Sequence, residues 1–520
     1  MQRSSMNRRE FLATAASAAA VTPAWARQIE GTGPAKRPNI LWIVADDHAP
    51  YVCGTYGNAR VRTPRLDRLA TQGLRFDQAY CCSPVCTASR QCFITGRYPR
   101  SVGVTQLATA LPESEPTLAH YLGEAGYETA AFGKMHFNSR LTHGFAHRLD
   151  LEEFHALRKR LGKKPLPAGV RVQPPWRPFK DPASVWLNSA CLPFDYTEED
   201  TSAAYFAGEA ERFMRQPRDK PFFLVVSFYE PHSPYNFPVE YRGRHSPGEF
   251  VAPRPGPEDA DQIPLVFKDL TDAQKCGSTA AYYTSAEFLD HSIGRVLDAL
   301  DRRGHADDTI VVYLADHGYL LGQHGRFEKH CGFDPAIRVP LIVRVPGITR
   351  AGSHTTSLVQ TIDLVPTMLD LCGIQIPQRV QGRSLLPVLR DNSAGHRDQL
   401  FIEYSENAEG YIRTDRWKFI YCAGDRVRRD GYVTANPTPG RTIHLFDLAA
   451  DPDEMTNLAH RPEHAERVRT FTEQLADHMK RTAREPDRVP KTQDVHQVLD
   501  FCLQPRDVSL EALKTNPPHR

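Results

Sequence analysis

Residues 39–48 read Asn-Ile-Leu-Trp-Ile-Val-Ala-Asp-Asp-His, an apolar run that ends in two adjacent carboxylates. An uninterrupted apolar run of this length is typical of a strand buried on both faces of a parallel sheet. Open α/β sheets bind ligands at the carboxyl ends of such strands. Asp46 and Asp47 repel each other unless a cation lies nearby. The stretch therefore predicts an α/β fold with a metal site at this edge; a turn with one solvated aspartate is the alternative.

Three later segments repeat this arrangement of a strand followed by polar residues. Because parallel strands end at a common edge, we expect their polar side chains to meet there. A surface lysine, a packed histidine, or a histidine that caps a proline-rich turn is the structural alternative. The segments are residues 127–132 followed by Lys134 and His136, residues 221–228 followed by His232, and residues 309–314 followed by Asp316 and His317.

Residues 86–97 read Cys-Thr-Ala-Ser-Arg-Gln-Cys-Phe-Ile-Thr-Gly-Arg. They predict a polar turn that leads into a short helix, which Gly96 can end in the left-handed conformation. A cysteine at a helix start lies in a positive field that favours an anion. Read alone, the segment is better explained as a structural thiol beside a surface arginine.

Taken together, these segments resemble the type I sulfatases of the alkaline phosphatase superfamily. Cys86, Ala88 and Arg90 match the family core C-x-[PA]-x-R, with alanine in place of the commoner proline. In that family the cysteine is oxidised after translation to formylglycine, whose hydrated aldehyde is the nucleophile. The resemblance runs from about residue 37 to about residue 458, and the frame around the core matches at residues 79–80, 84–86 and 95–99.

The resemblance implies an α/β fold of the alkaline phosphatase type. We expect a large mixed, mostly parallel sheet sandwiched by helices in a catalytic domain, residues 37–395. A smaller C-terminal antiparallel sheet with a helix follows in residues 396–480, where alternating apolar residues favour strands. Residues 481–520 form a C-terminal extension. Residues 138–199 are read as irregular and proline-rich, either shaping the substrate pocket or making a plain surface excursion.

The resemblance also implies a role for each site residue. Arg90 would steady the modified residue, and Lys134 and Lys329 would hold the sulfate oxygens. His232 would protonate the leaving group, and His136 would take the proton that lets sulfate depart. Carboxylate ligands favour Ca²⁺, with Mg²⁺ as the second choice. One such divalent cation would be held by Asp46, Asp47, Cys86, Asp316 and His317.

Composition excludes several classes of protein. The chain has 520 residues, 41% hydrophobic and 24% charged, which is ordinary for a globular protein. A net charge of +2 gives no reason to expect nucleic acid as a partner, and no apolar run after the leader is long enough for an integral membrane segment. Eleven cysteines in so long a chain argue against a disulfide scaffold. The spacing of Cys81, Cys82, Cys86 and Cys92 does not match a zinc site.

Residues 1–26 read as a twin-arginine signal peptide. Arg8 and Arg9 precede Phe-Leu, a mild alanine-rich stretch follows, and residues 24–26 offer an Ala-x-Ala cleavage site. A basic amphipathic helix of the mature protein is the alternative. We expect export to the periplasm or beyond through the twin-arginine machinery, after a formylglycine-generating enzyme has converted Cys86.

The function expected is hydrolysis of a sulfate ester, with a sulfated saccharide or a related small ester as substrate. The pair Asp316-His317, in place of Asp-Asn, is similar to carbohydrate-directed members such as the iduronate sulfatases. A phosphonate monoester or phosphodiester hydrolase of the same superfamily is one alternative. A non-catalytic binding protein with unmodified Cys86 is the other.

Overall fold

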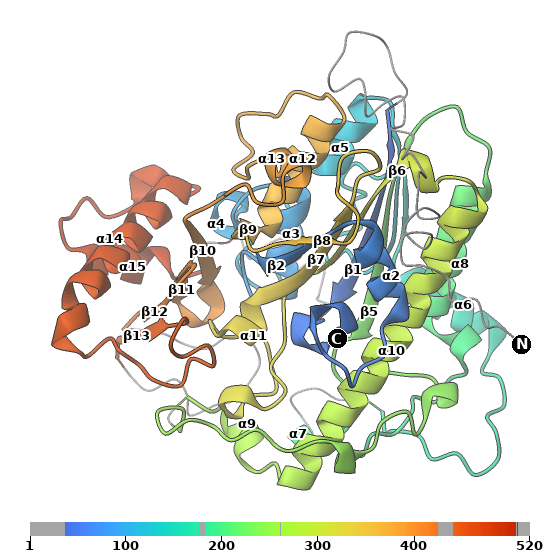
Figure 1. The fold of residues 1–520 in the computed structure, drawn as a ribbon, viewed down its shortest axis with the longest axis horizontal. Helices are drawn as coiled ribbons and strands as arrows, with labels where there is room; N and C mark the ends of the chain where they lie inside the picture. The colour runs from blue at the N-terminus through green and yellow to red at the C-terminus, as the bar shows by residue number, and fades with distance from the viewer. Residues whose placement is uncertain (1–36, 176–181, 261, 425–439, 506, 508–520) are drawn as a thin grey trace, which may run out of the picture.

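The apolar run at residues 39–46 forms an inner strand of a nine-stranded sheet in the computed structural model (Figure 1). The structure describes residues 37–175, 182–260, 262–424, 440–505 and 507, so the expected leader and residues 176–181 lie outside it. The strand order is β4-β3-β5-β1-β6-β7-β2-β8, and β9 pairs with β2. The strands are β1 (Asn39–Asp46), β2 (Leu74–Tyr80), β3 (Glu128–Gly133), β4 (His147–Leu149), β5 (Phe222–Pro231), β6 (Thr309–Ala315), β7 (Arg338–Arg344), β8 (Ser353–Thr355) and β9 (Val359–Gln360).

Strand direction sets where the site can form. β1 runs parallel to β5 on one side and to β6 on the other, with Ile43 opposite both Val226 and Tyr313. β3 is parallel to β5, whereas β7 is antiparallel to β6 and β2. The mixed, mostly parallel sheet is therefore confirmed. Because β3, β5, β1 and β6 share one direction, their carboxyl ends lie along one edge.

Helices cover both faces of this sheet, and β1 shows why. Its residues Ile40, Trp42 and Val44 lie in one core with α3, α5 and α12, whereas Leu41, Ile43 and Ala45 lie in a second core with α2, α8 and α10. Alternate side chains of a strand point to opposite faces, so a strand apolar on both faces needs two helical layers. These helices are α2 (Pro64–Gln72), α3 (Cys86–Thr95), α5 (Leu118–Glu124), α8 (Ser202–Arg215), α10 (Asp272–Arg302) and α12 (Leu364–Leu371).

A second, antiparallel sheet of four strands in the order β10-β11-β12-β13 lies beside the first, with α14 and α15 next to it (Figure 1). Val498, Leu499 and Leu503 share a core with Phe419 and Leu475. Part of the expected C-terminal extension thus completes the core of the smaller domain. The elements are β10 (Gln399–Tyr404), β11 (Glu409–Thr414), β12 (Trp417–Cys422), β13 (Thr442–Asp447), α14 (Ala465–Thr482) and α15 (Val495–Cys502).

The segment read as irregular, residues 138–199, contains a helix that the sequence analysis missed. α6 (Leu151–Leu161) begins with a capping box, in which the side chains of Asp150 and Glu153 each accept from the other residue's backbone N–H. The pattern Asp-x-x-Glu before a helical run was the available signal. The remaining helices are short: α4 (Pro99–Val102), α7 (Ala183–Trp186), α9 (Leu265–Lys268), α11 (Asp334–Ile337) and α13 (Leu386–Arg390).

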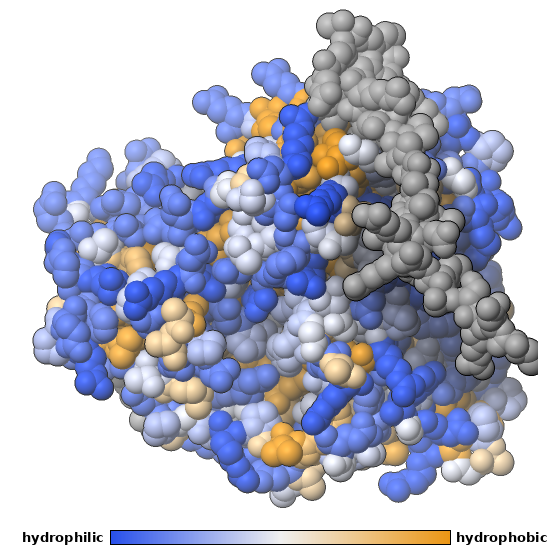
Figure 2. Space-filling model, viewed as in Figure 1, coloured by the Kyte–Doolittle hydropathy of each residue, from blue (hydrophilic) through white to orange (hydrophobic). Residues whose placement is uncertain are grey.

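The surface agrees with the composition. The face shown in Figure 2 carries mainly hydrophilic side chains, with small hydrophobic patches between them. Within the described ranges, none of the helices combines the length and the apolarity that crossing a bilayer requires.

Candidate active site

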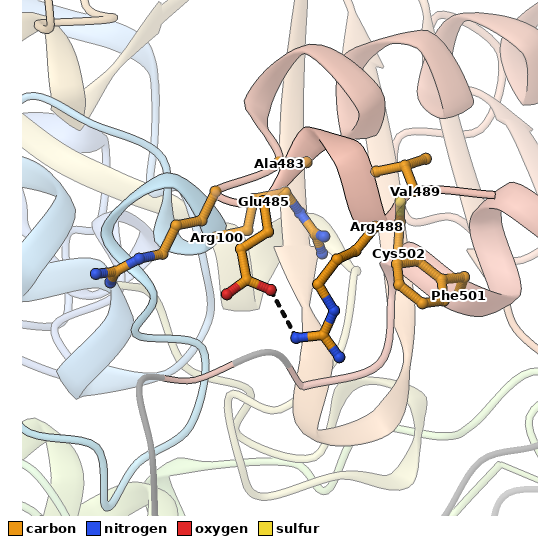
Figure 3. A pocket seen from close by; sticks show the side chains of 8 residues that line it. Arg100, Ala483, Glu485, Arg488, Val489, Phe501 and Cys502 are labelled. Carbon is orange, nitrogen blue, oxygen red and sulfur yellow. Dashed lines mark hydrogen bonds and ion pairs between the residues drawn. The ribbon is translucent and has the colours of Figure 1, made fainter. Parts of the chain in front are cut away.

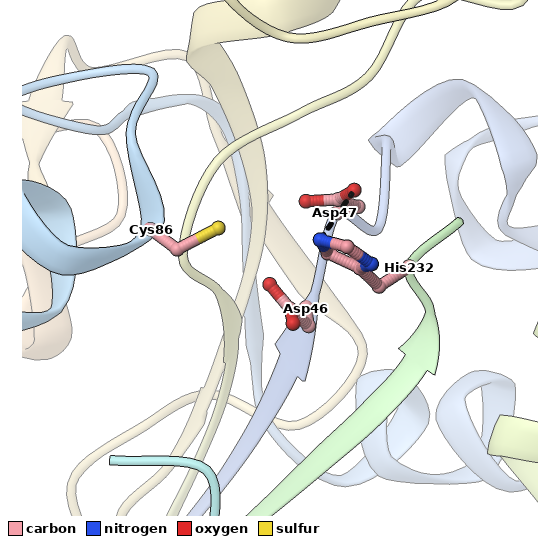
Figure 4. A group of neighbouring side chains, drawn as sticks. All are labelled: Asp46, Asp47, Cys86 and His232. Carbon is pink, nitrogen blue, oxygen red and sulfur yellow. Dashed lines mark ion pairs between the residues drawn. The ribbon is translucent and has the colours of Figure 1, made fainter. Parts of the chain in front are cut away.

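The polar residues that follow the parallel strands meet at one edge of the sheet. The ligand atoms of Asp46, Cys86, Asp316 and His317 all lie within 4.8 Å of one another, and so do those of Asp46, Asp47, Cys86 and His232. Figure 4 shows the second group, with the side chains of β1, α3 and the end of β5 pointing toward a common centre. All these residues except the half-buried His232 are buried. The expected convergence of strand ends is therefore present in the fold.

Cys86 is the first residue of α3, as the sequence predicts. Gly96 ends this helix in the left-handed conformation, with φ at 70°, and its N–H donates to the carbonyl of Cys92. The Cys86 Sγ lies 3.2 Å from Nε2 of His317, whose Nδ1 lies 2.9 Å from the carbonyl oxygen of Gly318. Burial raises the pKa of the Cys86 thiol. The start of α3 therefore places residue 86 against His317, one of the candidate ligands that follow β6.

Arg90, one helical turn after Cys86, ties the carboxylates together. Its Nε donates to Oδ2 of Asp316 at 2.8 Å, and its terminal nitrogen lies 3.5 Å from Oδ1 of Asp46. Its other terminal nitrogen donates to the hydroxyl of Ser227 at 2.8 Å and to the carbonyl of Lys134. Burial disfavours any lone charge here, and the guanidinium offsets the charge of both carboxylates, although its terminal nitrogen nearest Asp46 makes no hydrogen bond among the described residues.

Lys134 and Lys329 each pair with one of the two aspartates at the end of β1. Lys134 forms an ion pair with Asp46, and Nζ of Lys329 donates to both carboxylate oxygens of Asp47 at 2.8 and 2.9 Å. Burial alone would raise the pKa of Asp46, but Lys134 and its other cationic neighbours hold it well below its usual range. Burial likewise opposes the charge of Lys329, yet Asp47 raises the pKa of that lysine. Both lysines are therefore cationic beside residue 86 at neutral pH.

His232 and His136 differ in their contacts and in their backbone conformation. Burial lowers the pKa of His232 to about 4; its Nε2 lies 3.8 Å from Oδ2 of Asp47, and its Nδ1 lies 2.6 Å from the carbonyl of Ser233. His136 is not on an extended segment, because β3 ends at Gly133 and His136 has φ at 57°. Burial, then Lys134, puts the pKa of His136 well below the ordinary range, and its buried Nδ1 has no hydrogen-bond partner among the described residues.

The donor set fits a divalent cation. Two overlapping groups of ligand atoms, which share Asp46 and Cys86, contain three carboxylates, two imidazoles and one thiol, and the carboxylates suit a hard ion. Oδ1 of Asp46 is buried and has no hydrogen-bond donor among the described residues, so one carboxylate oxygen of the cluster is left for an ion. The donors named from the sequence are thus in place, and their roles stay predictions.

Other side chains that can bind metal lie outside this cluster. All eleven cysteines are free thiols, and among the described residues Cys81, Cys82 and Cys92 belong to no group of candidate ligands. His324 pairs with Asp259 at 3.0 Å and stacks on Phe333 at 3.6 Å, so it supports its loop instead of joining the cluster.

Two serines that the sequence analysis did not single out help to position the charged groups. The hydroxyl of Ser89 donates to the backbone carbonyl of Asp316, and that of Ser227 accepts from Arg90. Ser227 is a polar residue within the otherwise apolar run Phe222–Phe228, and Ser89 lies inside the core motif. A hydroxyl in a fully buried strand was the signal available, because buried polar groups need partners.

Comparison with known proteins agrees with this geometry. Residues 38–374 match the sulfatase family model, and residues 322–481 match the C-terminal region of N-sulphoglucosamine sulphohydrolase. An arylsulfatase of Clostridium perfringens is 31% identical, with 83% of this chain and 92% of the relative covered. A choline-sulfatase of Rhizobium meliloti is 29% identical over 82% and 83% of the two chains. An N-acetylglucosamine-6-O-sulfatase of Bacteroides thetaiotaomicron is 25% identical over 86% and 87%.

A solved structure shares the whole architecture. The phosphonate monoester hydrolase of Agrobacterium radiobacter superposes with a TM-score of 0.71 at 25% identity, covering 86% of this chain and 96% of its own. The family match covers more than half of the chain and includes every strand end that supplies the cluster. This chain is a member of the sulfatase family, the sulfuric ester hydrolases of the alkaline phosphatase-like superfamily.

Proposed function

We propose that this sulfatase hydrolyses its ester through a formylglycine made from Cys86, with one divalent cation, and that its substrate is a sulfated saccharide or a related small sulfate ester. The observation that carries the proposal is the convergence of Cys86 with Asp46, Asp47, Asp316 and His317, flanked by two buried lysines. So many buried charges in one place would destabilise a purely structural core, because each costs desolvation energy, and their clustering therefore favours a functional role.

The residues of the chain divide the chemical work among themselves. Sulfuryl transfer needs neutralisation of charge at sulfur, an oxygen nucleophile and a proton for the departing oxygen. Lys134 and Lys329 supply the positive charge, and both are anchored by carboxylates of β1. Arg90 holds Asp316 and Asp46 in fixed positions behind residue 86. The second hydroxyl of a hydrated aldehyde allows release of sulfate without a further attack on sulfur.

His232 and His136 suit opposite proton transfers. A sulfate group between the lysines adds negative charge beside His232, which favours the imidazolium that donates a proton to the leaving group. His136 is kept neutral by burial and by Lys134, and its free Nδ1 can accept a proton. The unpartnered Nδ1 of the neutral His136 and the position of His232 beside Asp47 support the assignment of base and acid, respectively.

Asp46, Asp47, Asp316, His317 and the side chain of residue 86 would hold the cation. Three carboxylates favour Ca²⁺, with Mg²⁺ next. When bound, the ion supplies Lewis-acid activation of the nucleophile.

The proposed substrate class is supported by the activities named for two relatives and by the dipeptide Asp316-His317. An N-acetylglucosamine-6-O-sulfatase and a choline-sulfatase are both among the relatives, so a sulfated sugar and a small sulfate ester are both candidates. Asp316-His317 favours the sugar. The phosphonate monoester hydrolase that shares the fold supports a second candidate activity on phosphonate or phosphate diesters.

A panel of substrates tests the proposal. Initial rates would be measured for an aryl sulfate, an aryl phosphonate monoester, choline sulfate and defined O- and N-sulfated saccharides. We expect a higher kcat/KM for sulfate than for phosphonate esters, and the highest value for a sulfated saccharide. A preference for the phosphonate monoester would establish the second candidate instead.

We also propose export by the twin-arginine route, with residues 1–26 as the signal. The paired Arg8-Arg9 and the Ala-x-Ala site support this proposal. In a cell that has the twin-arginine system, replacement of both arginines by lysine should leave the full-length chain in the cytoplasm. Unchanged periplasmic recovery would contradict the assignment.

A further inference from the structure

A loop that follows α4 is hydrogen-bonded to residues that lie close in sequence to Cys86 and His136. In this 104–110 loop, the carbonyl of Leu107 accepts from the hydroxyl of Thr87 at 2.6 Å and from Nδ2 of Asn138 at 2.8 Å. The carbonyl of Thr109 accepts from the same Asn138 amide at 3.1 Å. Thr87 follows Cys86 directly, and Asn138 lies two residues after His136. The backbone of this loop is therefore bonded to the residue next to Cys86 and to a residue two positions from His136.

The opposite side of the loop is held by one carboxylate from the far end of the chain. Asp507 accepts from the backbone N–H of Thr105 at 2.9 Å and from that of Gln106 at 3.1 Å. It also accepts from the hydroxyls of Thr105 and Thr109 and from the amide of Gln106 at 3.2 Å. Thr105 and Thr109 are 1% and 2% exposed, so no solvent replaces these bonds.

The chain that leads to Asp507 packs around the same helix from which the loop leaves. Ser101 of α4 donates to the carbonyl of Thr482 at 2.7 Å, and Arg484 donates to the carbonyl of Val102 at 2.8 Å. Arg100 lines a small cavity together with residues 483–485, 488–489 and 501–502 (Figure 3). The C-terminal segment is thus built against α4 before it reaches the loop, which makes Asp507 part of the fold around the site.

We propose that Asp507 is a positioning residue for the reaction: it fixes the 104–110 loop, which in turn fixes Thr87 beside residue 86 and Asn138 near His136. The inference rests on the proposed function, because it assumes that residue 86 and His136 react. Loss of the carboxylate leaves buried N–H and O–H donors without an acceptor, so the loop must move to find water. A shift of the reacting groups by about 1 Å can cost up to roughly a hundredfold in rate.

The test compares Asp507→Ala with Asp507→Asn and with a matched control, Asp500→Ala. Asp500 lies in α15 and pairs with Arg441 at 2.8 Å, away from the loop. Asp507→Ala should lower kcat on an aryl sulfate by about tenfold to a hundredfold and speed hydrogen exchange in residues 104–110. Asp507→Asn keeps one carbonyl acceptor and should recover part of the loss. Asp500→Ala should match the wild type.

Two further measurements separate the possible causes. The mass of the peptide around residue 86 shows whether each variant is modified to the same extent, and the melting temperature shows whether it is folded. Wild-type kcat in Asp507→Ala, or a loss of activity that only follows the unfolded fraction, would overturn the inference. An active wild type that carries an unmodified Cys86 would overturn the proposed function, while the effect of Asp507 on kcat could still be read.

Discussion

Cys86 is the side chain whose loss should stop turnover without unfolding the protein. Cys86→Ala removes the thiol that conversion to the aldehyde requires, whereas the helix start and its cap at Gly96 remain. We expect activity on an aryl sulfate to fall to background, and Cys86→Ser to behave in the same way. Circular dichroism and the melting temperature should stay close to those of the wild type. Near wild-type activity in Cys86→Ala would disprove the nucleophile assignment.

Removal of the cation is the second residue-scale prediction. Without a cation, Asp46 and Asp316 rely on Arg90 and Lys134 alone for neutralisation. Dialysis against a chelator should abolish activity, and Ca²⁺ should restore it better than Mg²⁺. Saturating Ca²⁺ should also raise the melting temperature, because an ion that binds only the folded state stabilises it. Full activity after exhaustive chelation, checked by elemental analysis, would argue against a metal role.

At this scale the sequence predicted most of the cluster, because each member follows an apolar strand or begins a helix. Asp46, His232 and Asp316 were found by that rule. The conformation of His136 was not, since a left-handed residue after a strand leaves no mark in the pattern of apolar residues. Asp507 lies in a polar stretch, and its role depends on a contact with residues about four hundred positions earlier in the chain, which the local sequence does not indicate.

At the scale of elements, Gly133 controls how β3 meets β5. It has φ at 101°, and an added Cβ would lie 1.8 Å from the carbonyl oxygen of Ser227. Gly133→Ala should therefore destabilise the protein by about 3 kcal/mol or more, through strain and a backbone clash. Gly126, at the other end of β3, also has a positive φ (93°) but open space around it. Gly126→Ala should cost only the strain, about 1–2 kcal/mol.

Urea unfolding of the two glycine variants would measure this difference. Because Ser227 also accepts from Arg90, Gly133→Ala should lower kcat as well as stability, whereas Gly126→Ala should leave kcat unchanged. Equal destabilisation by the two substitutions would show that the close approach at Gly133 does not matter.

Long apolar runs predicted the four parallel strands β1, β3, β5 and β6, whereas other elements, α6 and α15 among them, were not predicted. α6 carries a capping box and apolar residues at helical spacing, signals that were overlooked because most of its side chains are exposed; the apolar residues are Leu151, Phe154, Leu157 and Leu161. α15 is a short helix near the chain end whose apolar residues Val498 and Leu499 are explained only by the core they complete. Tertiary packing, not local preference, decides such elements.

At the scale of the whole molecule, a buried lysine joins the two domains. Lys418 of β12 is fully buried and pairs with Asp334 at 2.7 Å and Glu454 at 3.0 Å. Lys418→Met leaves Glu454 buried without its cation and Asp334 with only Arg413 at 3.4 Å, and should cost about 3–5 kcal/mol. The exposed pair of Arg469 with Glu466 offers a control, and Arg469→Met should change the melting temperature little. Comparable losses from both variants in thermal unfolding would contradict this reading.

Acid sensitivity should depend on a buried carboxylate in the large domain. Burial would raise the pKa of Asp363, but Arg397 and His396 bring it below its ordinary value. Its stabilisation is therefore present above pH ~4 and is lost as the pH falls through the folded pKa. The difference in unfolding free energy between the wild type and Asp363→Asn should be constant at neutral pH and shrink below pH ~4. A pH-independent difference in urea titrations would contradict this expectation.

The overall class of fold was predictable because apolar strands alternate with amphipathic helices along the chain. Strand order was not: β7 lies antiparallel between β6 and β2, although its sequence reads like any other buried strand. Pairing partners depend on the packing of the whole sheet, which no single segment encodes. The family resemblance supplied what the local pattern could not.

The most direct test of the central claim is the mass of the tryptic peptide spanning residues 76–90, taken from active protein. This peptide contains Cys81, Cys82 and Cys86. We predict an aldehyde at residue 86, lighter than cysteine, and intact thiols at the other two positions. A fully active preparation in which residue 86 is still cysteine would contradict the proposed nucleophile.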